Sequence, residues 1–252
     1  MNFQKHLIIF MKDKNIIKFK NTGYFEIKNF FSRELISKLN DEISKAQNVD
    51  KYFDRDNKLR RIERLYDKGV ILKKINNSLL KFLSSLFKKD FVIFKDKFNA
   101  KPVGGEGFEP HYDGIFLFEL KDKSKHRGWH KYSNFFVNAL VALDECNKES
   151  GALEISKADN LDFNQLLKNT KNDGTPKLNV DYATNLNFER IDLQPGDVLF
   201  FSNLCPHKSK KNDSNHERRI LYYTYAESKN PDIYEQYFKD KSLSTTSKGG
   251  AL

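Results

Sequence analysis

The chain has 252 residues, enough for one domain with a sizeable core, and its 22 Phe and 11 Tyr supply large apolar surfaces. Its 44 Lys and Arg against 34 Asp and Glu give a net charge of +10, but basic residues alternate with acidic ones, which is typical of a solvated surface. The only two cysteines, Cys146 and Cys205, fit neither a disulfide framework nor a CxxC metal site. The apolar run at residues 7–11 is too short to span a membrane, so we expect a cytoplasmic protein.

The first regular elements are expected between residues 16 and 44. Residues 16–28 predict two extended segments on either side of a turn at 21–23. Ser32 is suited to cap a helix that begins near Arg33, because Leu35, Ile36, Leu39 and Ile43 recur at helical spacing after it.

A second amphipathic helix is predicted over about residues 71–88. The charged segment 51–67 before it predicts a loop that could lie over a functional site. Residues from about 30 to 90 therefore form a helical support, which we expect to cover one outer face of a sheet.

Short apolar runs separated by turns replace this pattern from Phe91 onward. Strands are predicted over residues 91–98, 135–143, 151–156, 198–201 and 219–226, with residues 191–193 leading into the turn Pro195-Gly196-Asp197. Such spacing predicts a mainly β fold with flanking helices, a double-stranded β-helix (jelly roll, cupin-like) that can enclose a ligand at its mouth.

One domain is expected over residues 1–252, with the jelly-roll core at about 91–228. Residues 159–187 predict a polar insertion that contains a helix at 163–167. Residues 229–252 are predicted as a C-terminal tail, mobile from Ser242 unless it folds over the site.

His111-Tyr112-Asp113 is a candidate metal motif, because residues at i and i+2 of a strand point to the same face. Alone this spacing is common and usually has a surface role. His207 follows a turn and an apolar strand that would carry it to the mouth of the barrel. Together the three predict the two-His-one-carboxylate site of non-haem Fe(II) oxygenases, which leaves positions open for a co-substrate and O2.

Arg218 stands eleven residues after His207, at the start of the next apolar strand. A guanidinium inside a barrel needs an anionic partner, and the distal carboxylate of 2-oxoglutarate is the natural candidate. Arg219 would point to the opposite face of the same strand.

Three other histidines are weaker candidates for metal ligands. His216 lies in a polar loop with no strand before it, so it is a poor substitute for His207. His126 and His130 are four residues apart, but Gly128 lies between them and no further ligand stands at a suitable spacing.

These residues, with the sequence Gly-Asp-Val-Leu-Phe-Phe at 196–201 and His207-x-Ser209, resemble the phytanoyl-CoA dioxygenase family of Fe(II)/2-oxoglutarate oxygenases. The similarity extends from about residue 95 to 226. It implies that His111, Asp113 and His207 bind iron, that Arg218 and Ser209 bind 2-oxoglutarate, and that succinate and CO2 are products. Because the family's halogenases lack the carboxylate ligand, Asp113 favours hydroxylation or a desaturation-like oxidation.

The sequence defines the substrate-binding residues less specifically than the metal ligands. The candidate contacts are Lys97, Asn99, Lys101, Trp129 and Asn138. Basic residues near the pocket favour a small anionic or zwitterionic metabolite, an amino acid or an organophosphonate. The alternatives are a non-catalytic, cupin-like metal sensor and a nucleic-acid-directed oxygenase. Arg218 argues against the first, and Thr224, where the demethylase branch would place a second Arg, argues against the second.

Overall fold

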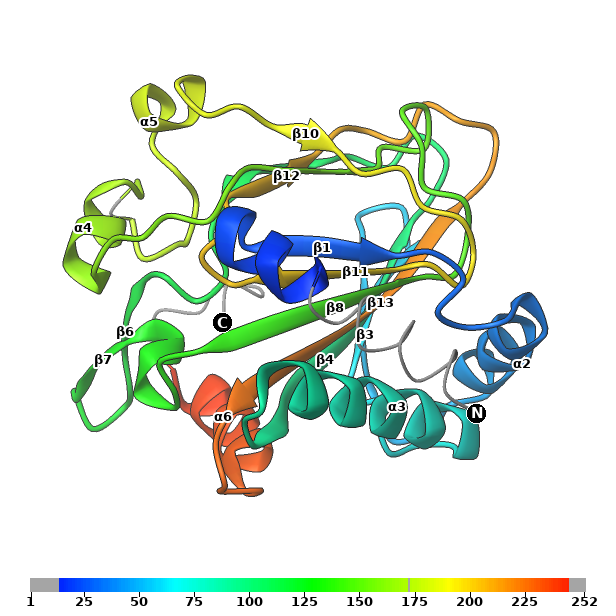
Figure 1. The fold of residues 1–252 in the computed structure, drawn as a ribbon, viewed down its shortest axis with the longest axis horizontal. Helices are drawn as coiled ribbons and strands as arrows, with labels where there is room; N and C mark the ends of the chain where they lie inside the picture. The colour runs from blue at the N-terminus through cyan, green and yellow to red at the C-terminus, as the bar shows by residue number, and fades with distance from the viewer. Residues whose placement is uncertain (1–13, 172, 245–252) are drawn as a thin grey trace.

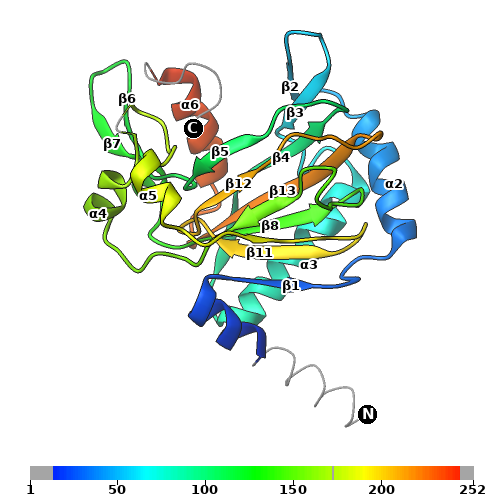
Figure 2. The same cartoon turned by 90° about the horizontal axis from the view of Figure 1, so that it is seen from above.

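Two antiparallel sheets form the body of the molecule, which the computed structural model describes for residues 14–171 and 173–244 (Figure 1, Figure 2). The larger sheet contains, in spatial order, β1 (Tyr24–Ile27), β11 (Val198–Ser202), β8 (Phe136–Ala142), β13 (Arg218–Glu227), β4 (Phe91–Lys101), β3 (Leu59–Glu63) and β2 (Asp50–Phe53). The smaller sheet contains β10 (Glu189–Arg190), β9 (Leu153–Ile155), β12 (His207–Ser209) and β5 (Phe108–His111). The predicted double-stranded β-helix is confirmed.

The outer face of the larger sheet is covered by α3 (Val70–Phe87), which runs beside β4 and β13 (Figure 1). Tyr223 and Tyr225 of β13 reach this helix, where their hydroxyls donate to the carbonyl of Leu72 at 3.3 Å and to the side chain of Asn76 at 2.9 Å. Side chains of a strand alternate between its faces, so Tyr222 and Thr224, which alternate with these tyrosines, point into the space between the two sheets.

Both predicted helices of the N-terminal region are present. Ser32 accepts a hydrogen bond from the N–H of Leu35 and caps α2 (Arg33–Ser44), whose residues Ile36, Leu39 and Ile43 are buried. Glu42 of α2 accepts hydrogen bonds from the first N–H groups of α3, at Ile71 and Leu72. The side chain of Glu42 in α2 therefore caps the N-terminus of α3.

The prediction of two extended segments over residues 16–28 is wrong for the first segment and confirmed for the second. Residues 14–22 are helical, and only β1 after Gly23 is extended. Ile16 and Phe19 are three residues apart, so a helix turns both toward the core, while Ile17 stays 57% exposed. Phe19 packs edge-on against Phe87 of α3, at 4.9 Å between ring centroids. This tertiary contact outweighs the preference of the β-branched residues for a strand.

The segment 51–67 is not simply a loop, because β2 and β3 form a hairpin at the edge of the larger sheet. β3 pairs with β4, with Arg61 opposite Asn99, and this pairing brings Arg61 to the space between the sheets.

The predicted tail contains α6 (Ile233–Leu243), which packs against β4. Tyr234 donates to Asp96 at 2.7 Å, and Lys95 donates to Tyr237 at 3.0 Å. The mobile end was expected from Ser242, but Ser242 and Leu243 belong to α6, so that part of the expectation is wrong. Residues 245–252 lie outside the described residues.

The remaining elements surround one end of the barrel. They are β6 (Leu117–Glu119), β7 (Lys125–Arg127), the short 3-10 helix η1 (Gly128–Lys131), α4 (Phe163–Lys168) and α5 (Val180–Thr184). α4 confirms the helix predicted within the insertion. Within the described ranges, no helix is both long and apolar enough to cross a membrane.

Candidate metal centre

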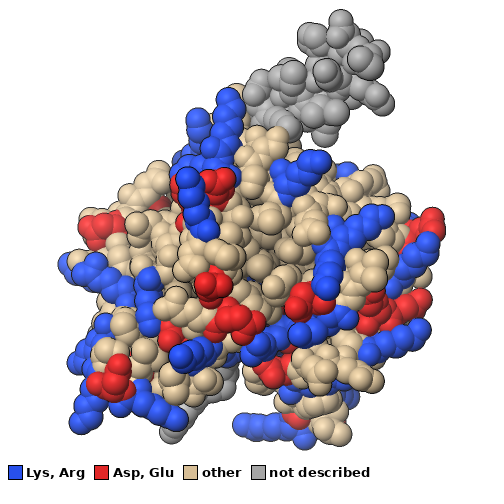
Figure 3. All heavy atoms as spheres, turned by 90° about the horizontal axis from the view of Figure 1, so that it is seen from below, with Lys and Arg blue, Asp and Glu red and all other residues tan. Residues whose placement is uncertain are grey.

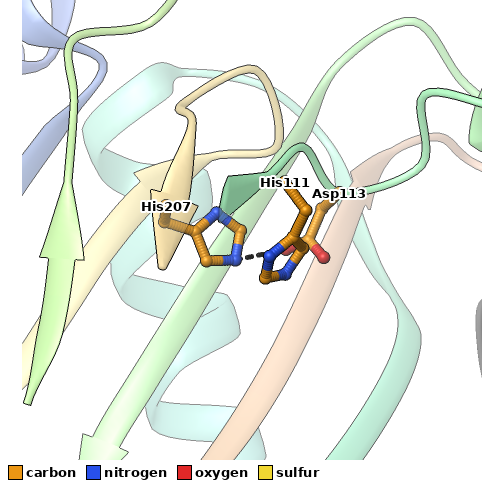
Figure 4. Close-up of side chains that lie close together, drawn as sticks. All are labelled: His111, Asp113 and His207. Atoms are coloured by element: carbon orange, nitrogen blue, oxygen red, sulfur yellow. Dashed lines mark ion pairs between the residues drawn. The ribbon is translucent and has the colours of Figure 1, made fainter. Parts of the chain in front are cut away.

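His111, Asp113 and His207 come together between the sheets (Figure 4). His111 is the last residue of β5 and His207 the first of β12, and these antiparallel strands place the two histidines directly opposite each other. Their ring centroids are 4.2 Å apart, and His207 Nε2 lies 3.8 Å from Asp113 Oδ2. Ligand atoms of all three lie within 4.8 Å of one another, so one metal ion could contact all of them.

Backbone carbonyls fix the tautomers of both imidazoles. His111 Nδ1 lies 2.8 Å from the carbonyl oxygen of Glu109, and His207 Nδ1 lies 3.0 Å from that of Cys205. A carbonyl only accepts, so each Nδ1 carries the proton and donates it. Both Nε2 lone pairs are therefore left for a metal.

Asp113 is held through its backbone as well as its side chain. Its N–H donates to the carbonyl of Asn203 at 3.2 Å, and Asn203 Nδ2 donates back to the carbonyl of Asp113 at 3.2 Å. Asn203 precedes His207 by four residues in the same turn, so these bonds tie the two metal-facing segments together. The amide of Asn138 donates to Asp113 Oδ2 at 2.8 Å.

The electrostatics suit a divalent cation. Burial, followed by the nearby His207, lowers the pKa of His111 to about 3, and burial also lowers the pKa of His207. Burial would raise the pKa of Asp113, but His207, Lys97 and His111 outweigh it and hold that pKa below its usual value. At neutral pH the site thus offers two neutral imidazoles and a carboxylate, a donor set that fits Fe(II).

These pKa shifts predict that acid destabilises the metal-free protein. The unfolded chain takes up protons on its histidines near pH 6.5, whereas the folded site resists protonation down to about pH 3 at His111. The free energy of unfolding should therefore fall as the pH drops from about 6.5 toward 3. Urea unfolding of the metal-free protein at several pH values measures this fall, which should be shallower for His111→Gln. Equal slopes for the two proteins would contradict the prediction.

A cavity of about 390 Å³ opens beside the three residues. At one end lies Arg218, which is only 3% exposed and faces Lys101 across the β13–β4 ladder. Its Nε has no hydrogen-bond partner among the described residues, and no carboxylate there lies within ion-pair distance of it. Ser209 lines the same end. A buried cation of this kind needs an anion, and a bound carboxylate would provide one.

Lys97, Asn99 and Trp129, three of the five expected substrate contacts, line the cavity, whereas Lys101 and Asn138 lie behind its wall. Lys101 Nζ donates to the carbonyls of Gly151 and Lys210 and to the hydroxyl of Ser209, at 2.5–3.1 Å. Burial, followed by Arg218, lowers the pKa of Lys101 to about 7. Its contacts are therefore those of a structural residue that fixes the loop after β12.

The sequence interpretation missed several lining residues. Arg61 enters through the β3–β4 pairing, and Tyr222 of β13 lines the wall four residues after Arg218. The polar insertion at residues 159–187 forms part of the cavity rim. There the backbone of Lys177 forms an antiparallel β-bridge with that of His111, and the N–H of Tyr112 donates to the carbonyl of Pro176. Tyr222 could have been found, because period 2 along its strand places it on the same face as Arg218.

The alternative histidines lie elsewhere. His216 is exposed beside Asn215, and His126 contacts Ser124. His130 packs its ring against Phe163 at 4.9 Å. Within the part of the chain that the structure describes, only His111, Asp113 and His207 form a group able to hold a metal ion.

Comparison with known proteins agrees with this geometry. The sequence model of the phytanoyl-CoA dioxygenase (PhyH) family matches residues 19–220. The chain belongs to the phytanoyl-CoA dioxygenase family. The resemblance seen in the sequence is thereby confirmed.

Two curated relatives are named for phosphonates. The chain is 31% identical over 160 residues to a methylphosphonate hydroxylase of Gimesia maris, an alignment that covers 64% of this chain and 55% of that protein. It is 26% identical over 238 residues to a 2-aminoethylphosphonate dioxygenase of an uncultured bacterium, which covers 89% of this chain and 85% of that protein. The chain thus spans little more than half the length of the first relative.

Solved structures share the fold. HygX from Streptomyces hygroscopicus, solved with nickel, 2-oxoglutarate and hygromycin B, superposes with a TM-score of 0.63 at 16% identity, covering 86% of this chain and 87% of its own. The carbocyclase SnoK from nogalamycin biosynthesis superposes with a TM-score of 0.64 at 12% identity, covering 94% of each chain. At these identities the likeness concerns the fold alone.

Proposed function

We propose that this dioxygenase uses Fe(II), 2-oxoglutarate and O2 to hydroxylate a small organophosphonate, with succinate and CO2 as products. The observation that carries the proposal is that one cavity joins the three candidate metal ligands to Arg218, a buried cation without a carboxylate partner among the described residues. When bound, the iron supplies the redox chemistry that couples decarboxylation of 2-oxoglutarate to oxidation of a C–H bond.

The protein residues orient and enclose the reactants. His111, Asp113 and His207 would occupy one face of the metal and leave the opposite positions for the co-substrate and O2. Arg218 and Ser209 would hold the distal carboxylate of 2-oxoglutarate. The segment at residues 175–177 would limit access of water from the rim.

Lys97 is our candidate for the residue that binds the substrate's anionic group. It points into the cavity from β4 with its Nζ 4.6 Å from the ring centroid of Tyr222, and no carboxylate within the described ranges lies within ion-pair distance of it. Arg61, which pairs with Glu63 at 3.4 Å, adds positive charge to the same wall. A phosphonate, with up to two negative charges, suits this wall better than a neutral headgroup.

The carboxylates of the cavity favour an anion over a zwitterion. In the described part of the chain these are Asp113, which the metal would engage, and Glu109, which pairs with Lys171 at 2.9 Å and with Lys177. A substrate ammonium would have to displace one of these partners. We therefore propose an alkylphosphonate without an amino group as the preferred substrate.

The test is succinate formation from purified enzyme with Fe(II), 2-oxoglutarate and a panel of methylphosphonate, ethylphosphonate, 2-aminoethylphosphonate and amino acids. Succinate should form in proportion to hydroxylated product, and fastest with the simple alkylphosphonates. Turnover stimulated by amino acids alone would overturn the phosphonate assignment.

Lys97→Gln is expected to raise the KM for the phosphonate about 10- to 100-fold, because a charge-assisted hydrogen bond to the substrate is lost. The KM for 2-oxoglutarate should change little. Lys208→Gln is the matched control, because Lys208 also lines the cavity but pairs with Glu154 at 3.4 Å and covers the ring of Phe188. Steady-state kinetics of both variants check this, and equal effects would contradict it.

The charge on the face drawn in Figure 3 does not favour a nucleic acid as the substrate. On the face in Figure 3, basic and acidic side chains are interspersed rather than gathered into a basic stripe. The metal-sensor alternative gives Arg218 no anion to bind, so the oxygenase explains more of the cavity.

A further inference from the structure

Asn138 and Thr224 form a buried pair directly behind the candidate metal ligand Asp113. Asn138 of β8 and Thr224 of β13 are opposite each other in the larger sheet, and they are 1% and 3% exposed. Thr224 Oγ1 lies 2.6 Å from Asn138 Oδ1, and Asn138 Nδ2 lies 2.8 Å from Asp113 Oδ2. The three side chains thus form a continuous chain from the middle of the sheet to the metal centre.

The direction of these hydrogen bonds follows from chemistry. An ionised carboxylate only accepts, so the amide must turn its NH2 group toward Asp113. Its oxygen then faces Thr224, whose hydroxyl must donate to it. Each bond fixes the orientation of the next group, and the β-branched Thr224 has few rotamers available to break the chain.

The carboxylate needs this support because a nearby cation attracts it. Lys97 acts on Asp113 electrostatically, whereas His207 Nε2, 3.8 Å from Asp113 Oδ2, presents a lone pair that does not hold the carboxylate in place. A carboxylate free to rotate could turn toward Lys97. The metal would then lose one ligand, and Lys97 would no longer be available to bind the substrate. The amide of Asn138 opposes that rotation.

We propose that Asn138 and Thr224 are positioning residues that hold Asp113 in its metal-binding orientation, so that the pair sets the metal affinity of the site. This inference rests on the proposed function only in that the three ligands bind a divalent metal. It assigns Asn138 a contact with the ligand rather than with the substrate, and it assigns a role to Thr224.

The test measures Co(II) affinity and the visible Co(II) spectrum without 2-oxoglutarate or substrate. We expect Asn138→Leu to weaken Co(II) binding about 10- to 100-fold, the range for groups that orient metal ligands, and to change the spectrum. Thr224→Val should weaken binding roughly 2- to 10-fold, as loss of one hydrogen bond would, while Thr224→Ser should restore it. The valine and serine variants keep the test decisive if Asn138→Leu fails to fold.

Asn76→Leu is the matched control. Asn76 is also a buried amide that accepts from a β13 hydroxyl, that of Tyr225 at 2.9 Å, but it lies on the opposite face of the sheet. Its loss should cost stability and leave the Co(II) affinity unchanged. Wild-type affinity in folded Asn138→Leu and Thr224→Val would overturn this inference alone, whereas a wild-type protein that binds no divalent metal would overturn the proposed function with it.

Discussion

Alanine in place of His111 or His207 is expected to reduce phosphonate-dependent succinate formation to the level of a metal-free control. Each imidazole contributes one Nε2 to a site with three protein ligands, and its tautomer is already set by a backbone carbonyl. With one nitrogen lost, the remaining imidazole and Asp113 hold a divalent metal too weakly to retain it. Metal content of the purified variants and coupled succinate assays measure the effect.

His216→Ala is the control for this experiment. His216 is exposed, contacts Asn215 and lies outside the group of candidate ligands, so the variant should keep its metal and its turnover. Circular dichroism should show that all three variants remain folded. Unimpaired turnover after His111→Ala would contradict the assignment of the metal centre.

Period-2 alternation explains why much of the site could be predicted. Arg218 faces the cavity and Arg219 faces away because they are adjacent on β13. Such inferences need only the local geometry of a strand. The helices that begin at Arg33 and Val70 were equally accessible, because capping and apolar spacing are local signals. The strand expected at residues 111–113 ends at His111, and Asp113 lies in the bend after it, where its bonds to Asn203 rather than strand alternation hold it beside His111.

Features that depend on distant pairing were beyond the sequence interpretation. Arg61 reaches the cavity only because β3 joins the edge of the larger sheet at β4. α6 is ordered by the partners of Tyr234 and Tyr237 on β4, which a polar C-terminal sequence does not reveal. The helix at residues 14–22 likewise depends on aromatic contacts of Phe19.

A second limit of sequence patterns is that they do not show whether a side chain on the correct face extends into the cavity. Lys97, Asn99 and Lys101 share one face of β4, yet only the first two line the cavity, because the ammonium of Lys101 is held by two carbonyls and Ser209. The side-chain amide of Asn138 likewise binds Asp113 and does not line the cavity. Period 2 gives the direction of a side chain, whereas its neighbours decide whether the polar end meets a ligand.

The positive charge of the cavity divides into two ends, with Arg218 at one and Lys97 at the other. The two side chains are four residues apart across the β4–β13 ladder, because Arg218 pairs with Lys101 and Tyr222 pairs with Lys97. We therefore expect two separate anions to bind at once on the same wall. This separation is the reason to expect that variants at the two ends affect the two reactants independently.

Replacing Arg218 by Ala is expected to raise the KM for 2-oxoglutarate about 100- to 1000-fold, a loss of about 3–4 kcal/mol, because it leaves the distal carboxylate buried without a counter-charge. Arg218→Lys should recover part of the affinity, since an ammonium keeps the charge but not the two parallel hydrogen bonds. Co(II) affinity should stay near that of the wild type in both variants. Steady-state kinetics with varied 2-oxoglutarate measure the effect.

Arg219→Ala is the matched control for that prediction. Arg219 is adjacent in sequence but points to the other face, where its guanidinium forms two hydrogen bonds of 2.8 Å with Asp144. Its loss should lower stability without changing the KM for 2-oxoglutarate, because the ion pair lies outside the cavity lining. If Arg219→Ala raised that KM as much as Arg218→Ala does, the effect would come from the shared strand, and the carboxylate clamp would have to be placed elsewhere.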